Sequence, residues 1–333
     1  MTYVGRMIAA LVAPTLAAIW PCLAAAQPPP LDPEDPPAVV RTGVDLSERI
    51  TIPIRIDGKG PYDFIVDTGS QRTVISRELA TTLALAADTP VSVLSITGIS
   101  DVDTVTVPTL SFGSSKMKGV QAPVFAGDAL GAAGLIGLDG MRSKRLILDF
   151  QKKRMDITSS NKRLPSDSEA IIVEARTRLG QLILIDSSAN GEKVHVILDT
   201  GSAYSIGNAA LLRKLEKRQP DAYADPITIT SVTGTELVGR WGYIRNIKLG
   251  GVTMQNVAVA FVDTSLFEEL GLEDKPALLL GINVLRGFRR IAIDFGRKRV
   301  DFVLPDQGAL ASAKFAALEP DITEQVGGHS AKP

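Results

Sequence analysis

Two aspartates stand at the same point of two similar segments, and together they could act as an acid–base pair. Asp67 follows the apolar run 64–66, Asp199 follows the apolar run 196–198, and each begins the tetrapeptide Asp-Thr-Gly-Ser. A carboxylate takes a proton from water when it is ionised and gives one when it is neutral. Two facing carboxylates in different protonation states can therefore activate a water molecule for hydrolysis.

The simplest alternative is that both tetrapeptides are ordinary turns, because Asp and Gly are common turn residues. Average residue usage puts one chance copy of Asp-Thr-Gly in a chain of this length at under roughly ten per cent. Two copies, each after an apolar run and each followed by Ser, are far less expected by chance. The duplication therefore favours a paired site over two unrelated turns.

Each aspartate is expected at the end of a β-hairpin. Residues 52–66 and 182–198 each consist of two apolar runs around a turn that contains glycine, at Gly58 and at Gly191. Such turns between apolar runs are typical of antiparallel hairpins. Both carboxylates are then placed where a strand ends and the chain must turn.

The order of elements repeats beyond the aspartates, which indicates internal duplication. An apolar-apolar-Gly segment follows in each half, at 135–137 and 279–281, and a strand ending in Asp-Phe then precedes a basic turn. The two Asp-Thr-Gly-Ser segments are 132 residues apart (199 − 67), an ordinary domain size. The carboxylates of the Asp-Phe pairs, Asp149 and Asp294, are expected to face solvent or to cap the basic turns.

Composition argues against several functional classes. The chain has 333 residues, 45% apolar and 22% charged, so it can form a hydrophobic core. Its net charge of −1 offers no basic surface for nucleic acid or for an anionic membrane. The single cysteine, Cys22, and the two histidines, His195 and His329, argue against disulfides, a histidine-rich zinc site and a Ser-His-Asp triad. We expect no metal and no cofactor.

Residues 1–26 have the pattern of a signal peptide. A positively charged start, a largely apolar run over 7–23 and small residues at 24–26 are typical of a cleaved export signal. The alternative is a membrane anchor, but Pro14 and Pro21 interrupt the apolar run and favour cleavage. We therefore expect a periplasmic or secreted protein without stable membrane insertion after cleavage.

The remaining chain is predicted to form two lobes with short connecting segments. The predicted segments are a proline-rich leader at 27–38, a first lobe at 39–158, a polar linker at 159–168, a second lobe at 169–305 and a C-terminal tail at 306–333. Short apolar runs with frequent turn signals predict a mainly β fold with barrel-like lobes. The few expected helices cover 76–85, 208–218 and a segment from 265 that stops at Gly271.

In these features the chain resembles the aspartic peptidases of the pepsin and retropepsin type, and in particular exported bacterial retropepsin-like proteins. The resemblance covers residues 50–303 and rests on the two Asp-Thr-Gly-Ser segments and the two apolar-apolar-Gly segments. It implies a bilobal pseudo-dimer of two homologous retropepsin-like β-barrels, with each apolar-apolar-Gly segment packed beneath a catalytic turn. It also implies an endopeptidase whose peptide or protein substrate lies extended between the lobes.

The resemblance implies that Asp67 and Asp199 form a catalytic dyad that holds a water molecule, while Thr68 and Thr200 reach across and lock the two turns together. Like charges about 3 Å apart cannot both ionise cheaply, so one pKa of such a dyad falls and the other rises, as is established for aspartic proteases. The two values belong to the pair, and the sequence does not assign the acid and the base. Activity is expected at acidic to mildly acidic pH.

The other residues of the two turns are given supporting roles by the same resemblance. Gly69 and Gly201 would permit tight turns and bring N–H groups towards the carboxylates, and Ser70 and Ser202 would hydrogen-bond the outer carboxylate oxygens. Two hairpin tips would form flap-like covers that contact the substrate: Thr97, Gly98, Thr233 and Gly234.

Two alternatives to a single-chain enzyme stay open. A catalytically silent homologue with the same fold would bind peptides or envelope proteins without cleaving them. The lobes could also pair between two chains, which would give a homodimer instead of the expected monomer. Binding of a transition-state inhibitor without turnover would favour the first alternative, and a fully active monomer would exclude the second.

Overall fold

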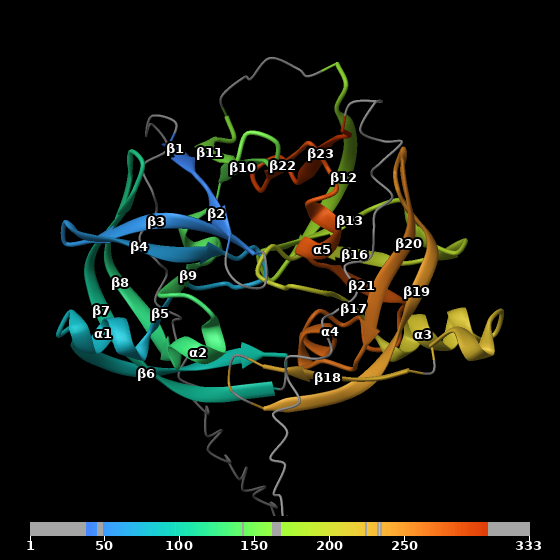
Figure 1. Cartoon of the computed structure of the whole chain (residues 1–333), viewed down its shortest axis with the longest axis horizontal. Helices are drawn as coiled ribbons and strands as arrows, with labels where there is room; N and C mark the ends of the chain where they lie inside the picture. Colours follow the sequence, from blue (N-terminus) through green and yellow to red (C-terminus); the bar gives the residue numbers. More distant parts are fainter. Residues whose placement is uncertain are drawn as a thin grey trace, which may run out of the picture.

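A computed structural model describes residues 38–44, 49–96, 98–141, 143–161, 168–223, 225–231, 233 and 235–305. The predicted signal peptide and C-terminal tail, and most of the predicted leader and linker, lie outside the described residues. Thr97 and Gly234, two of the four expected flap residues, also lie outside them. The lobe boundaries 39–158 and 169–305 remain sequence-based predictions. Over the described residues the fold is mainly β with two lobes, as predicted (Figure 1).

The first lobe is a β-barrel. Its strands are β2 (Gly43–Val44), β3 (Ile50–Ile56), β4 (Lys59–Val66), β5 (Val74–Ser76), β6 (Ala86–Ser95), β7 (Gly98–Phe112), β8 (Ser115–Phe125) and β9 (Gly134–Ile136). They follow the order β2-β3-β4-β9-β5-β8-β7-β6, and an added pairing of β3 with β7 closes the sheet on itself. Alternate residues of β3, such as Ile52 and Ile54, are buried in the interior, as a two-residue repeat requires.

The second lobe repeats this arrangement. Its strands are β13 (Gln181–Leu184), β14 (Ser187–Ala189), β15 (Glu192–Lys193), β16 (His195–Leu198), β17 (Ser205–Gly207), β18 (Asp225–Thr230), β19 (Glu236–Leu249), β20 (Val252–Phe261) and β21 (Ala277–Leu280). The order β13-β16-β21-β17-β20-β19 matches β3-β4-β9-β5-β8-β7 of the first lobe, and β18 pairs with β19 as β6 pairs with β7. The pairing of β14 with β19 takes the place of the β3–β7 pairing. The internal duplication predicted from the sequence is therefore confirmed.

Helices are short and lie outside the barrel walls. They are α1 (Arg77–Thr82), α2 (Gly127–Leu130), α3 (Ala209–Glu216), α4 (Ser265–Glu269) and α5 (Ile282–Leu285), with 3₁₀ turns η1 (Leu138–Gly140) and η2 (Pro220–Tyr223). Ser76 caps α1 and Asn208 caps α3 through their side chains, as expected. Gly271, with φ +54°, follows the end of α4. No helix within the described residues has the length and apolar character needed to cross a membrane.

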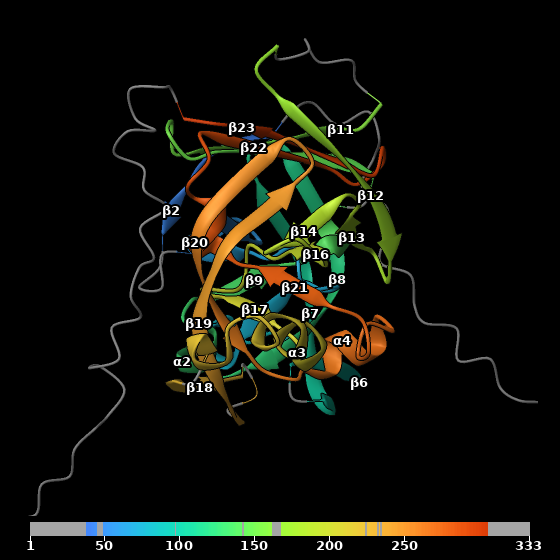
Figure 2. The same cartoon turned by 90° about the vertical axis from the view of Figure 1, so that its right-hand side faces the viewer.

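Six strands join the two lobes. They are β1 (Ala38–Arg41), β10 (Lys144–Asp149), β11 (Arg154–Ser159), β12 (Ile171–Arg178), β22 (Arg290–Asp294) and β23 (Arg299–Val303). They follow the order β1-β11-β10-β22-β23-β12, in which β10 of the first half pairs with β22 of the second. Through the pairing of β12 with β13 they continue into the sheet of the second lobe. Figures 1 and 2 show these strands together at the top of the molecule. In this chain the two lobes therefore pair with each other.

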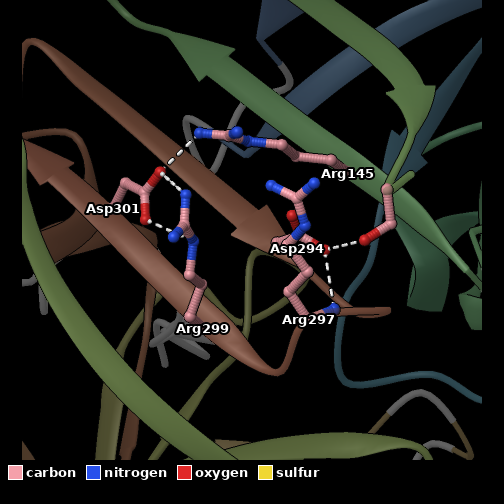
Figure 3. Close-up of polar contacts among 6 residues, drawn as sticks. Arg145, Asp294, Arg297, Arg299 and Asp301 are labelled. Atoms are coloured by element: carbon pink, nitrogen blue, oxygen red, sulfur yellow. Dashed lines mark hydrogen bonds and ion pairs between the residues drawn. The ribbon is translucent and has the colours of Figure 1, made fainter. Parts of the chain in front are cut away.

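Polar side chains cross this seam (Figure 3). Arg145 on β10 forms an ion pair with Asp301 on β23, and Ser160, just after β11, donates a hydrogen bond to Asp294. Asp294 also accepts a hydrogen bond from the Arg297 N–H (2.9 Å), which caps the basic turn after β22. The Arg297 bond confirms the expected role of Asp294 as a turn cap. Asp294 is fully buried, so it does not face solvent. Desolvation by the neighbouring strands makes these internal partners necessary.

Candidate active site

The strands that carry the two aspartates end side by side with the apolar-apolar-Gly segments. β4 pairs in parallel with β9, and β16 pairs in parallel with β21. The Asp67 N–H donates to the Ile136 carbonyl and the Asp199 N–H donates to the Leu280 carbonyl, both at 3.0 Å. Each turn is therefore anchored by backbone hydrogen bonds, and the predicted packing of the apolar-apolar-Gly segments against the turns is confirmed.

The glycines that end these segments are required by close approach. A Cβ atom added to Gly137 would lie 2.4 Å from the Arg72 carbonyl oxygen, and one added to Gly281 would lie 2.4 Å from that of Tyr204. Real Cβ atoms do not approach a backbone atom this closely, so the backbones pass each other only if a side chain is absent. The apolar-apolar-Gly pattern thus marks the place where the turn and the neighbouring segment cross.

The two threonines lock the turns to each other. The Thr68 N–H donates to Thr200 Oγ1 (3.2 Å), and the Thr200 N–H donates to Thr68 Oγ1 (3.1 Å). Each hydroxyl donates to the strand before the opposite turn, Thr68 to the Leu198 carbonyl (3.0 Å) and Thr200 to the Val66 carbonyl (2.5 Å). Both side chains are buried, so these four bonds have no water to replace them. The structure places both threonines as the resemblance implied.

The two glycines after the threonines contact both carboxyl groups. The Gly69 N–H donates to Asp67 (2.7 Å) and the Gly201 N–H donates to Asp199 (2.8 Å). A Cβ atom on Gly69 would lie 2.6 Å from Asp199 Cγ, and one on Gly201 would lie 2.3 Å from Asp67 Cγ. Neither glycine has a positive φ. The N–H groups of both glycines therefore point to the carboxylates as the resemblance implied, and the reason for glycine is close contact with the opposite carboxylate.

The serines of the two turns differ from expectation. The Ser70 hydroxyl donates to the Arg72 carbonyl (2.8 Å), and the Ser202 hydroxyl donates to the Tyr204 carbonyl (2.7 Å). A hydroxyl has one hydrogen to donate, so each serine closes its own turn instead of donating to a carboxylate. The Ser70 backbone N–H makes the carboxylate contact, at 3.0 Å from Asp67.

The two carboxyl groups share a hydrogen bond and one environment. Both are half-buried where the lobes meet. Burial raises the pKa of Asp67, against hydrogen bonds from Asp199, Gly69 and Ser70 and the nearby charge of Arg49, which lower it. Burial also raises the pKa of Asp199, well above its usual range, and the negative charge of Asp67 raises it further. Two carboxyl groups this close cannot both ionise cheaply, so the pair favours one ionised and one neutral member.

Two matching side-chain pairs support the turns and were not predicted. Thr73 donates through its hydroxyl to Asp139 (2.7 Å) and through its N–H to the same carboxylate (2.8 Å). In the second lobe, the Ser205 hydroxyl donates to Asn283 (3.0 Å). The signal was in the repeat, because both hydroxyl residues follow their aspartate by six positions (73 − 67 and 205 − 199). Burial raises the pKa of Asp139, against its hydrogen bonds from Thr73.

The hairpins expected to act as flaps lie on the side of the molecule opposite the six joining strands (Figure 1). Gly98 begins β7 at the tip of the β6–β7 hairpin, and Thr233 lies in the turn between β18 and β19. The first tip reaches the second lobe, where the Ser265 N–H of α4 donates to the Ile96 carbonyl (3.2 Å). Contact of these tips with a substrate stays a prediction.

Comparison with known families agrees with this geometry. The family model described as "Aspartyl protease" matches residues 52–139 and 185–284, together more than half of the chain. The chain belongs to the aspartyl protease family. The two matched regions fall one on each lobe of the protease, and each includes one Asp-Thr-Gly-Ser turn and its apolar-apolar-Gly segment. No curated protein matches the chain.

The raised pKa of Asp199 has a consequence for stability. A carboxyl whose folded-state pKa exceeds the ordinary 3.8 binds more protons in the folded than in the unfolded protein, so its contribution is present at low pH and is lost as pH rises. We expect the melting temperature of Asp199→Asn to exceed that of the wild type near neutral pH. The expected gain is on the order of a degree or two, since about 1 kcal/mol shifts the melting temperature by about 2–4 °C in chains of about 150–250 residues and by less in a longer chain.

Thermal unfolding of both proteins between about pH 4 and about pH 7 measures this effect, and the difference should shrink towards the acid end. Asp63→Asn is the matched control, because Asp63 lies on β4, the strand that ends just before Asp67, and its side chain is exposed. Parallel curves for the wild type and Asp199→Asn would show that the dyad carries no excess proton in the folded state.

Proposed function

We propose that the protein is an aspartic endopeptidase that hydrolyses peptide bonds with a water molecule activated between Asp67 and Asp199. The observation that supports this proposal is the meeting of two half-buried carboxyl groups, one from each lobe, each lying against the glycine of the opposite turn. Such a pair can hold one proton and one negative charge in the same site. Membership of the aspartyl protease family supports the same reaction class.

The reaction would need only these two groups and water. The ionised carboxylate takes a proton from water as the water oxygen bonds to the peptide carbonyl carbon, and the neutral carboxyl gives its proton to the carbonyl oxygen. As the C–N bond of the resulting diol breaks, one diol hydroxyl gives its proton to the ionised carboxylate and the nitrogen takes the proton of the other carboxyl. An acid and an amine leave, and the dyad again holds one proton and one negative charge. Backbone donors at Gly69, Ser70 and Gly201 stabilise the carboxylate charge throughout.

The substrate in this proposal is an extended peptide segment bound between the lobes, with the β6–β7 and β18–β19 hairpins as covers. The enzyme would act as a monomer, because the two aspartates already meet within one chain. It would act in the periplasm or outside the cell, as the sequence of residues 1–26 indicates.

Cleavage of a mixed peptide library between about pH 3 and about pH 7, with products identified by mass spectrometry, tests the proposal. We expect internal cuts with a maximum on the acidic side of neutrality, from the chain that begins at residue 27 or from a form without 27–38. Peptides that bind without being cut, in both forms and at every pH, would instead identify a peptide-binding member of the family.

A further inference from the structure

Arg49 and Gln181 occupy the same position in the two lobes. Each lies 18 residues before the aspartate of its lobe (67 − 49 and 199 − 181). Arg49 directly precedes β3, and Gln181 begins β13, the strands that pair with the aspartate-bearing strands β4 and β16. The pair is therefore related by the internal duplication, but one member is a cation and the other is neutral.

Both side chains reach across to the glycine of the opposite turn. Gln181 Nε2 donates to the Gly69 carbonyl (2.7 Å), and Arg49 Nη1 donates to the Gly201 carbonyl (3.4 Å). Arg49 Nη2 also donates to the Leu130 carbonyl (2.6 Å) at the end of α2, which holds the guanidinium in place. The two contacts are equivalent in position and differ in charge.

Each side chain also belongs to the lobe of one aspartate. Arg49 directly precedes β3, which pairs with the Asp67-bearing strand β4, and Gln181 begins β13, which pairs with the Asp199-bearing strand β16. The glycine that Arg49 contacts, Gly201, has its Cα against the Asp67 carboxyl, and Gly69, which Gln181 contacts, has its Cα against that of Asp199. Arg49 consequently places a positive charge near Asp67, while Gln181, bonded to the Gly69 carbonyl, brings no charge to the Asp199 side.

The electrostatics of the pair agree with this placement. Burial raises the pKa of Asp67, and the charge of Arg49 is among the effects that lower it, whereas burial and the charge of Asp67 both raise the pKa of Asp199. Among the described residues, the side chains that act on Asp67 are those of Asp199 and Arg49, and the side chain that acts on Asp199 is that of Asp67. The acidic residue of α2, Asp128, accepts a hydrogen bond from the Ala129 N–H (2.8 Å).

We propose that Arg49 is a positioning residue that makes Asp67 the ionised member of the dyad and leaves the proton on Asp199. This inference rests on the proposed function for its catalytic meaning. Asp67 then takes the proton from water as the new C–O bond forms, and Asp199 gives its proton to the carbonyl oxygen. The Arg49/Gln181 difference thus assigns the base and the acid in a site whose other parts are nearly symmetric.

Carboxyl ¹³C NMR titration of the complete mature chain tests the assignment without any need for turnover. Signals are assigned with Asp67→Asn and Asp199→Asn. We expect Asp67 to ionise at lower pH than Asp199 in the wild type. The difference between the two ionisation midpoints should be smaller in Arg49→Gln. The order of the two midpoints should be reversed in the exchange variant Arg49→Gln/Gln181→Arg. Arg49→Lys, which keeps the charge, should keep the wild-type order. The same order and gap in Arg49→Gln as in the wild type would overturn the proposal.

The pH dependence of kcat/KM gives a second readout. Loss of the cation raises the pH at which Asp67 becomes protonated, so the acidic limb of the profile should move to higher pH in Arg49→Gln and stay in place in Arg49→Lys. A purely structural role would lower activity at every pH without moving the limb. The NMR titration needs no substrate, so its result does not depend on peptide cleavage. A protein that cuts no peptide would refute the proposed function, and the titration would still test the role of Arg49.

Discussion

Asp199→Asn is expected to lower kcat/KM for peptide cleavage by about 10³-fold or more, because an amide cannot hold and release the proton that the reaction needs. The substitution keeps the size of the side chain. It also keeps an oxygen that can accept the hydrogen bond from the Gly201 N–H, which lies 2.8 Å from Asp199 Oδ1 in the wild type. The fold should therefore survive, and the loss should appear in kcat. Asp67→Asn is expected to have an equal effect, since the base is then missing.

This prediction is measured by single-substrate kinetics on a peptide identified from the library, with circular dichroism as the check on folding. Asp63→Asn is again the matched control and should retain full activity, because that exposed carboxylate lies on β4 away from the turn. Wild-type activity in a folded Asp199→Asn protein would show that the pairing of Asp67 with Asp199 is not the catalytic unit.

Thr200→Val is expected to lower the free energy of unfolding by about 2–4 kcal/mol, because it leaves two buried backbone groups without partners. Valine has the shape of threonine but loses the donor to the Val66 carbonyl and the acceptor for the Thr68 N–H. These bonds join the lobes directly beneath the carboxylates. We also expect kcat/KM to fall by about 10²-fold, since small displacements of a catalytic pair are costly.

Urea unfolding and peptide kinetics measure the two effects of Thr200→Val. Thr158→Val is the matched control: Thr158 is buried on β11, and its hydroxyl has no hydrogen-bond partner in the described part of the chain. Removing that hydroxyl should leave stability unchanged or raise it, because no bond is lost. A Thr200→Val protein as stable and active as this control would show that the crossed threonine bonds do not hold the site together.

Much of the fold could be predicted because the same sequence pattern occurs in both halves of the chain. The apolar runs before Asp67 and Asp199 and the two apolar-apolar-Gly segments depend only on local periodicity and on spacing along the chain. Their pairing as β4 with β9 and β16 with β21 follows the same pattern in both lobes. The two matching copies also allowed the pairing of Asp67 with Asp199 to be predicted, because each copy has one aspartate at the same position.

Other features could not be predicted because they depend on which groups meet across the lobes. The Ser70 hydroxyl turns to the Arg72 carbonyl, and Gly69 is needed for its distance from Asp199 and not for its backbone angles. The burial of Asp294 against Ser160 likewise depends on the pairing of β10 with β22. Hydrogen-bond partners of this kind are set by three-dimensional proximity, which local sequence pattern does not encode.

The sequence by itself determined the duplication, the mainly β class and the two aspartates, because strand periodicity and repeated motifs are local properties of the chain. Only the tertiary structure decided which side chains of the two halves meet around the two aspartates, and how these halves differ there. Arg49 and Gln181 stand at equivalent positions in the sequence, but only the structure shows that each side chain donates to the glycine carbonyl of the opposite turn. The effect of a charge falls off with distance in space, so the proposed assignment of acid and base depends on that crossing between the lobes.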